Sequence, residues 1–208
     1  MTKLKEGMEL SILNAAEELF TEKGFNGVST TEIALKVGCN QALIHYYYRT
    51  KANLFQKVFE NKLRYLMSIF DIREDNSLSF EDNLKIRIES HFDAIAKNPK
   101  LPMFILNEIK NNPITNELIR QTYKDNIPNL IINLEKELSL EIKAGRIRDI
   151  SAFDLMVNIT SLNIFPFLSL PIIEQFYTMD EEMTKVMFGN RKHEIVTTIL
   201  NSIRVIKD

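Results

Sequence analysis

The sequence predicts an all-α protein. Apolar residues recur at the helical spacing of three and four positions along most of the chain, and helix-capping residues stand where these runs begin and end. No segment alternates with the period of two that is typical of strands. Most glycines precede residue 39 and all six prolines follow residue 98, so we expect a short domain over residues 1–52 and a longer helical domain over residues 53–208.

Two capping signals delimit the first helices. A helix is predicted over residues 8–23, because Gly24 can end it in a left-handed cap. Ser29 and Glu32 form a capping box in which the hydroxyl and the carboxylate can each accept a backbone N–H. A short second helix is therefore expected to begin there and to stop at Gly38.

The remaining helices follow from similar signals. Asn40 can cap a third helix over residues 41–47, and Thr50 can cap a long fourth one that runs through Leu66. Prolines inside a helical pattern are expected to kink or break it, here at Pro128, Pro166 and Pro171. Further helices are expected over residues 79–98, 103–110, 114–144, 151–170 and 180–206.

The second and third helices, joined by a short turn, are typical of a helix-turn-helix, whose second helix enters the major groove of DNA. Gly38 can adopt the backbone conformation that the turn requires. The third helix carries too many polar-tipped side chains for a buried helix, and we expect only Leu43 or Ile44, together with Tyr48, to face the core.

The charge distribution is compatible with this motif. A net charge of −2, taken alone, argues against nucleic acid. That average is misleading, because phosphate binding needs a local patch and no Asp or Glu occurs between Ile33 and Phe59. The basic residues of this stretch are Lys36, Arg49, Lys51 and Lys57.

Glycine, aromatic residues and lysine fall in a common register over residues 28–34 and 38–48 and at Lys51, Leu54 and Phe55. With these residues, the segment 12–55 resembles the DNA-binding domain of TetR-family transcriptional regulators. The resemblance implies a homodimer that binds double-stranded DNA at a palindromic operator and holds a small effector in a rear pocket. Our hypothesis is a repressor that the effector releases from the operator by shifting the fourth helix.

The resemblance also implies roles for individual residues. Gln41 stands at the exposed start of the recognition helix and alone there can make a bidentate contact to adenine. His45 replaces a tyrosine that is usual in the family, so its phosphate contact is expected to be shorter and pH-sensitive. Lys51 matches a phosphate clamp. The candidate DNA-binding residues are Thr30, Thr31, Gln41, Ala42, Leu43, His45, Tyr46, Tyr47 and Lys51.

The rear domain is rich in Phe, Ile and Met, and by the resemblance some of these residues would surround the effector. Few charges fall within the apolar runs, so a ligand would be hydrophobic or weakly polar. Core packing is the alternative for each residue, because apolar residues at helical spacing usually belong to the core. The candidate ligand-binding residues are Phe92, Phe104, Ile105, Ile109, Tyr123, Ile127, Phe165, Phe167 and Phe176.

A dimer interface is predicted near the C-terminus. Residues 153–170 are more apolar than one core-facing stripe requires, and a four-helix interface across a two-fold axis would bury the excess. Two recognition helices about 34 to 36 Å apart could then read successive major grooves. The last helix would contribute Val196, Ile199, Leu200, Ile203 and Ile206.

Composition excludes several other classes. Apolar residues at 45% and charged residues at 26% argue against disorder, and polar residues interrupt the apolar runs before the roughly 18 positions of a membrane span. The single Cys39 cannot form an internal disulfide, so the cytoplasm is the expected compartment. Neither a metal nor another cofactor is expected.

Two alternatives to an effector-controlled regulator stay open. One is a DNA-binding architectural or regulatory protein of the same fold that has no effector. The other is a helical-bundle enzyme, which would need a titratable cluster or catalytic motif, and the sequence has neither. We therefore expect that the protein is not an enzyme.

Overall fold

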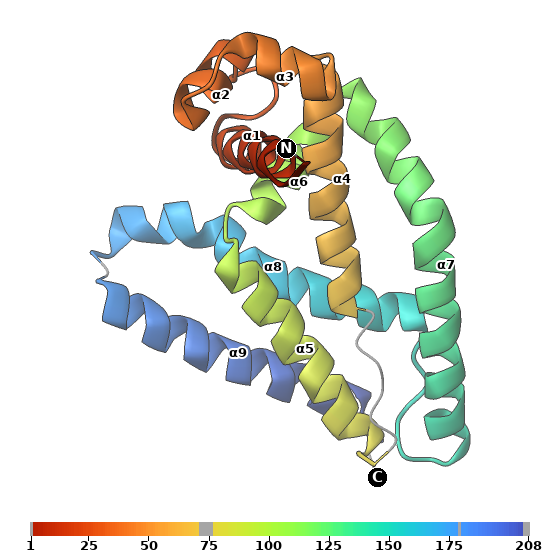
Figure 1. The fold of residues 1–208 in the computed structure, drawn as a ribbon. Coiled ribbons are helices and arrows are strands. Elements are labelled where there is room, and N and C mark those ends of the chain that lie inside the picture. The colour runs from red at the N-terminus through yellow and green to blue at the C-terminus, as the bar shows by residue number, and fades with distance from the viewer. Residues whose placement is uncertain (1, 71–76, 179, 206–208) are drawn as a thin grey trace. The chain divides into compact units, whose positions relative to one another are not determined.

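The computed structural model describes residues 2–70, 77–178 and 180–205, and over these ranges the protein is all-α, as predicted (Figure 1). One isolated bridge, between Ile147 and Arg204, interrupts the helical character of the described residues. The helices are α1 (Thr2–Lys23), α2 (Thr30–Val37), α3 (Gln41–Tyr48), α4 (Lys51–Phe70), α5 (Phe80–Lys97), α6 (Leu101–Asn111), α7 (Pro113–Lys143), α8 (Ala152–Phe176) and α9 (Glu181–Ile203).

The chain forms two compact units. Unit 1 comprises residues 1–66 and 103–123, and unit 2 comprises residues 67–102 and 124–208. Unit 1 thus contains the predicted helix-turn-helix together with most of α4, most of α6 and the start of α7. The boundary that the sequence places after residue 52, at the end of the helix-turn-helix domain, remains a prediction.

Three prolines expected to interrupt helices do not break them. The helical backbone of α7 continues through Pro128, and that of α8 continues through Pro166 and Pro171. A proline removes one backbone hydrogen bond and crowds the preceding turn, at a cost of about 3 kcal/mol. Helix α8 continues to Phe176, whereas the sequence predicted an end at Leu170.

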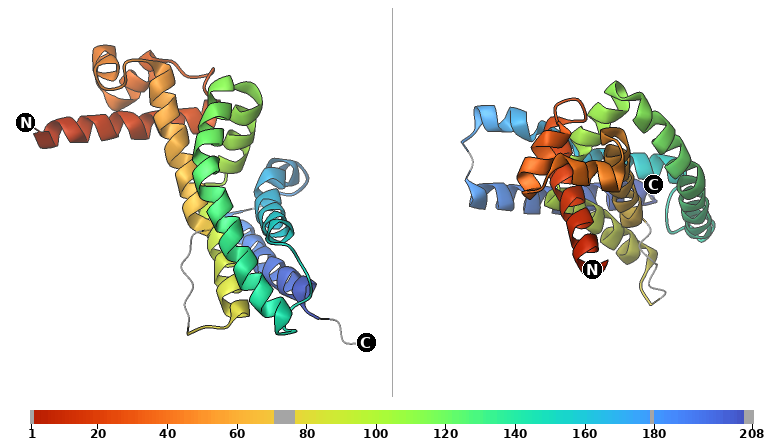
Figure 2. Two further views of the ribbon diagram at one scale, coloured as in Figure 1. Left: turned by 90° about the vertical axis from the view of Figure 1, so that its right-hand side faces the viewer. Right: turned by 45° about the horizontal axis from the view of Figure 1, so that its top comes forward.

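Aromatic rings fill the core of unit 1. The Phe20 and Phe55 rings meet edge to face with centroids 5.2 Å apart, and Phe104 of α6 meets Phe59 of α4 at 5.9 Å. In Figure 2, α1 runs across α4, and α2 and α3 lie near the N-terminal end of α4. The long helices α1 and α4 therefore provide the apolar surface on which the two short ones rest.

Unit 2 is built from α5, α8 and α9, which pack against one another, and from the second half of α7. A bidentate ion pair between Arg87 of α5 and Glu137 of α7, at 2.6 and 3.1 Å, supports this packing. The predicted use of α9 as a dimer interface was wrong for three residues, which pack into the core of their own chain: Val196, Ile199 and Ile203. Leu200 is partly buried against that core, and Ile206 lies outside the described residues.

Helix α8 carries two apolar stripes. One is buried and includes Leu155, Ile159 and Phe167. The other is exposed, with successive intervals of four, eight, seven and four positions: Phe153, Val157, Phe165, Ile172 and Phe176. By length and composition alone, α8 could cross a membrane, since an 18-residue window has a mean hydropathy of 1.6. Polar residues such as Asn158 and Asn163 interrupt this segment, as expected from the sequence, and length and composition alone are weak evidence for a membrane span.

A buried polar pair interrupts the apolar contact between α5 and α8. The Asn163 amide nitrogen donates to the Ile88 carbonyl at 3.0 Å and to His91 Nδ1 at 2.9 Å. Both side chains are almost fully buried, at 0% exposure for Asn163 and 1% for His91. Burial lowers the pKa of His91 from 6.5 to about 4, so the folded protein holds this imidazole neutral with Nδ1 as an acceptor.

This burial predicts an acid-sensitive stability. In the unfolded chain His91 is protonated below about pH 6.5, whereas in the folded chain it is protonated only below about pH 4. Protonation between these values therefore favours the unfolded chain, and the free energy of unfolding falls as the pH falls from about 6.5 to about 4. The slope is at most about 1.4 kcal/mol per pH unit, or about 2 kcal/mol between pH 6.5 and pH 5. Urea denaturation at these two pH values measures the loss.

The His91→Gln variant keeps an acceptor for Asn163 and removes the titrating group, so most of the pH-dependent loss should vanish. His193 is exposed on α9, and His193→Gln should retain the full loss. An unchanged pH dependence in His91→Gln would show that another group is responsible.

Candidate DNA-binding surface

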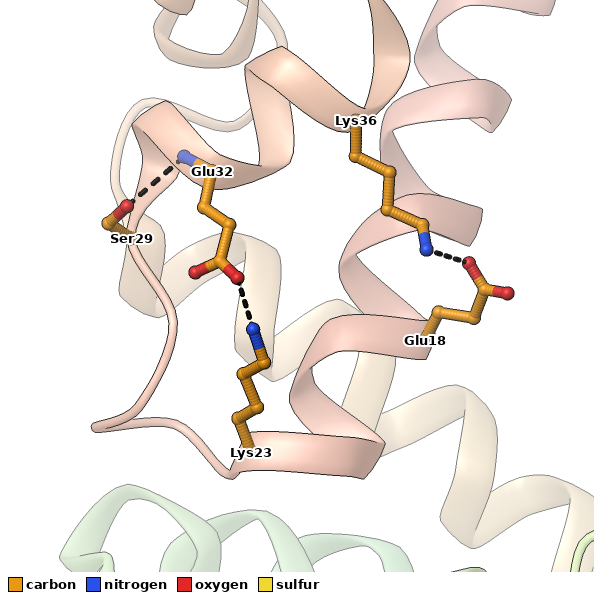
Figure 3. Close-up of polar contacts among 5 residues, drawn as sticks. All are labelled: Glu18, Lys23, Ser29, Glu32 and Lys36. Atoms are coloured by element: carbon orange, nitrogen blue, oxygen red, sulfur yellow. Dashed lines mark hydrogen bonds and ion pairs between the residues drawn. The ribbon is translucent and has the colours of Figure 1, made fainter.

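Helix α2 is held by its cap and by two ion pairs to α1 (Figure 3). The Ser29 hydroxyl accepts the Glu32 backbone N–H at 3.1 Å, as the capping box predicts. The Glu32 carboxylate pairs with Lys23 of α1, and this hydrogen bond lowers the pKa of Glu32. A weaker hydrogen bond from the Ser29 backbone also lowers this pKa, so the carboxylate interacts with its own helix start and with α1.

The turn and the start of α3 match the sequence-based predictions. Gly38 has φ 74° and ψ 31°, and the Cys39 N–H donates to the Ala34 carbonyl at 3.0 Å. The Asn40 side chain accepts the Leu43 N–H at 3.0 Å, so it caps α3. These local bonds fix the direction in which α3 leaves the turn.

The buried faces of α2 and α3 determine which residues point outward. Ile33 and Ile44 are at most 1% exposed, and the predicted inward position of Tyr48 is confirmed. The Tyr48 hydroxyl donates to the Glu9 carbonyl of α1 at 3.1 Å, and burial raises the pKa of Tyr48 to about 12. Thr31, Gln41, Ala42, His45 and Tyr46 are exposed, whereas Thr30, Leu43, Tyr47 and Lys51 are half-buried.

One hydrogen bond joins the starts of the two short helices. The Gln41 side-chain amide donates to the Thr30 hydroxyl at 2.6 Å. This bond uses one of the two amide hydrogens, so the amide oxygen and the other hydrogen can still pair with N6 and N7 of adenine. The contact therefore orients Gln41 before it meets a base.

His45 has a defined proton position. Its Nδ1 lies 2.9 Å from the Arg49 carbonyl, and because a carbonyl only accepts, Nδ1 carries the hydrogen. In the neutral ring Nε2 is then an acceptor, which cannot bond a phosphate oxygen. Only the charged imidazolium can donate from Nε2 to a phosphate oxygen.

Lys51 contacts an aromatic face. Its ammonium lies 4.4 Å from the centroid of the Phe25 ring, a cation–π contact that holds the charge near the turn after α1. Tyr46 and Tyr47 also stack edge to face, with centroids 5.1 Å apart. The aromatic residues thus orient part of the predicted site.

The local positive patch is narrower than the sequence suggests, because Lys36 pairs with Glu18 at 2.6 Å (Figure 3). Sequence reasoning also left Arg49 and Lys57 out of the candidate site. They line an open groove of about 570 Å³, and no carboxylate of the described residues forms an ion pair with either. The groove residues are Glu9, Leu10, Leu13, Tyr47, Tyr48, Arg49, Asn53 and Lys57.

A buried carboxylate ties α6 to the turn after α1. Glu108 is 6% exposed, and its Oε1 accepts the Phe25 backbone N–H at 2.8 Å. Its Oε2 accepts the side-chain amide of Asn112 at 3.1 Å. No local sequence pattern indicates this contact, since Glu108 and Phe25 are 83 positions apart.

The candidate ligand-binding residues fall in different places. Phe104, Ile105 and Ile109 belong to unit 1, whereas the rings of Phe92 and Phe167 meet in unit 2 at 5.1 Å. Phe165 and Phe176 are exposed on α8. The side chains of Tyr123 and Ile127 lie outside the described residues.

Comparison with known proteins identifies this arrangement of helices. Residues 12–58 match the sequence model of the bacterial regulatory proteins of the tetR family. The chain carries the DNA-binding domain of the TetR family. It is therefore a DNA-binding transcriptional regulator, and α2, its turn and α3 form the family's helix-turn-helix.

Full-length relatives extend this similarity. The fatty acid metabolism regulator protein of Bacillus subtilis is 21% identical over 201 residues, which cover 97% of this chain and 94% of the relative. A putative fatty acid metabolism regulator of Clostridium perfringens has the same fold, with a TM-score of 0.66, 21% identity and coverage of 95% of this chain and 100% of that one.

A shorter match involves the negative transcriptional regulator IcaR of the biofilm operon icaADBC in Staphylococcus epidermidis. It is 27% identical over 94 residues, which are 45% of this chain and 51% of the relative. The match therefore spans about half of that regulator. TetR-family regulators bind DNA operators and typically act as dimers.

The Gln41 geometry predicts a position-specific effect. Gln41→Ala should relax the preference at one base position in each half-site by about 1–3 kcal/mol. Thr30→Val removes the hydroxyl that orients Gln41, so it should relax the same position to a smaller extent. Binding of a randomised operator library, followed by sequencing, measures this preference.

Thr197→Val is the control, because Thr197 is exposed on α9 of unit 2 and does not belong to the candidate DNA-binding residues. It should leave the base preference unchanged. Relaxation at different positions in Gln41→Ala and Thr30→Val would contradict the proposed orientation.

Lys51 predicts an effect on salt dependence instead. Lys51→Ala should weaken all DNA sequences alike and reduce the slope of log affinity against log salt by about 1 for each phosphate that the variant no longer binds. Titrations by fluorescence anisotropy at several salt concentrations measure the slope. Lys85, which is exposed on α5, gives the control Lys85→Ala, and equal slopes in the two variants would exclude a phosphate contact by Lys51.

Proposed function

We propose that this TetR-family regulator is a homodimeric repressor that occupies a palindromic operator and is released by a small hydrophobic effector. The observation that carries the DNA-binding part is the outward face of α2 and α3, on which Gln41 is oriented by Thr30. The role as a repressor is supported by the S. epidermidis relative, a negative regulator.

The dimer is supported by α8. Its exposed side carries large apolar residues between Phe153 and Phe176, and apolar surface of this kind often marks an interface with another chain. An eight-residue recognition helix also contacts too few bases to be selective alone. Two copies related by a two-fold axis would cover the exposed apolar side of α8 and present two recognition helices to DNA. A dimer of this kind is compatible with a cytoplasmic protein.

The effector part rests on the apolar character of unit 2 and on the relatives. Phe92, Phe167 and Phe188 form an aromatic cluster, with the Phe167 and Phe188 rings stacked at 4.7 Å. The B. subtilis relative regulates fatty acid metabolism, which suits an effector with an acyl chain. On effector binding, a shift of α4, which begins at Lys51, would move the recognition helices apart, with a coupling of about 1–3 kcal/mol.

An architectural DNA-binding protein without an effector is the second candidate, and it would keep the same contacts of α2 and α3 with DNA. The family is regulatory, which disfavours the third candidate, a helical-bundle enzyme. Within the described residues, no three His, Cys, Asp or Glu side chains come together to hold a metal ion.

The dimer proposal predicts that operator binding and association fail together. Val157 lies on the exposed stripe of α8, and Val157→Glu should yield a folded monomer whose operator affinity is lower by about a hundredfold, because the two half-sites are no longer bound as one unit. Sedimentation measures association, and mobility shift with the DNA upstream of its own gene measures affinity.

Asn158→Glu is the control, since Asn158 is exposed next to Val157 and does not belong to the stripe. It should leave both measurements unchanged. If wild-type protein does not retard this DNA even at low salt, or if the Val157→Glu monomer binds as tightly as wild type, the proposal is wrong.

A further inference from the structure

We propose that the buried amide oxygen of Asn163 is the hydrogen-bond partner of the effector, and that the effector is a neutral molecule with a hydroxyl or amide N–H beside an apolar body. The inference rests on the proposed function and adds to it the chemical class of the ligand. It depends on one acceptor in the core of unit 2 whose bonding is incomplete.

The orientation of Asn163 is fixed by two bonds. Its amide nitrogen donates both hydrogens, one to the Ile88 carbonyl and one to His91 Nδ1. Rotating the amide by half a turn would place its oxygen against the Ile88 carbonyl, and two acceptors repel each other. The Oδ1 atom therefore has to point away from both partners.

Oδ1 has no hydrogen-bond partner within the described part of the chain, although Asn163 is fully buried. Most buried polar atoms in folded proteins are paired, and leaving one unpaired is unfavourable. An apolar residue at this position would remove that cost. A hydrogen-bond donor on a ligand would also remove this cost, because it would pair with Asn163 Oδ1.

The surroundings select the rest of the ligand. Ile159 and Phe167 lie one turn before and after Asn163 on the buried stripe of α8, and Phe167 contacts Phe92 of α5. An aliphatic or aromatic body would be in contact with these apolar side chains. The amide would then bind only the polar end of the ligand.

Charge selects against an anionic head group. His91 is neutral, since burial lowers its pKa to about 4. The nearby cations are paired near the surface of unit 2, Arg87 with Glu137 and Lys192 with Asp93. A carboxylate would face the Asn163 oxygen without a donor between them, so it should be rejected, whereas an alcohol or a primary amide donates directly.

The alternative is that the pair only fixes the register of α5 against α8, with Oδ1 bonded to a buried water. Both explanations require the bonds to Ile88 and His91. They differ in whether a ligand with a donor is preferred over a ligand of the same size without one.

Four probes with the same chain length separate these explanations: octanol, octanamide, methyl octanoate and octanoate. Octanol and octanamide should raise the thermal unfolding temperature and weaken operator binding. Methyl octanoate, which only accepts, and octanoate, which is an anion, should bind at least about fivefold more weakly, as expected when one hydrogen bond is missing.

Asn163→Leu should abolish the preference, so that octanol and methyl octanoate bind alike. Asn158→Leu is the matched control, because Asn158 is exposed on the same helix, and it should keep the preference of wild type. If Asn163→Leu does not fold, Asn163→Met replaces it, and a crystal structure with octanol must place the hydroxyl within hydrogen-bond distance of Asn163 Oδ1.

Equal affinity of wild type for octanol and methyl octanoate would overturn the inference, as would a preference that persists without Asn163. A water on Oδ1 with octanol elsewhere would also overturn it, and so would protein that binds operator but none of the probes. That last result would leave the DNA-binding part of the proposed function intact. Failure of wild type to bind any operator would instead contradict the proposed function.

Discussion

The DNA-binding surface depends on the burial of one face of α2 and one face of α3 against α1 and α4. Each of these helices has eight residues, and isolated helices of this length are not stable in water. Ile33 and Ile44 are the buried residues of the short helices, and the Phe20 and Phe55 rings of the long helices meet in the core of the same unit. The burial of these faces determines which side chains of α2 and α3 point outward.

Side-chain bonds then refine what the apolar contact allows. The caps at Ser29 and Asn40 set where each short helix begins, and the bond from Gln41 to Thr30 links these two beginnings. Lys23 and Lys36 form ion pairs that hold α2 to α1. The positive charges that are left for phosphates therefore come from the end of α3 and from α4, where Arg49, Lys51 and Lys57 stand.

The route from an effector to the DNA-binding surface has a structural basis in unit 1. Glu108 fixes α6 to the turn after α1, and Phe104 of the same helix packs on Phe55 and Phe59 of α4. A displacement of α6 would therefore reach both α1 and α4. Since the two long helices carry the short ones, the proposed release of operator needs no contact between the effector and α3.

The sequence by itself determined the helical class, the caps of α2 and α3 and the outward face of the recognition helix, because these depend on residues within one turn of each other. Ser29, Gly38 and Asn40 act locally, and the structure places them as the pattern predicts. Only the tertiary structure decided the long-range contacts. Glu108 contacts Phe25, Glu32 pairs with Lys23 of α1, and Asn163 contacts His91 across two helices. The spacing of residues along the chain does not predict these pairs, because they form only when packed helices bring distant side chains together. Buried polar atoms then pair with a nearby group, since an unpaired buried polar atom is unfavourable.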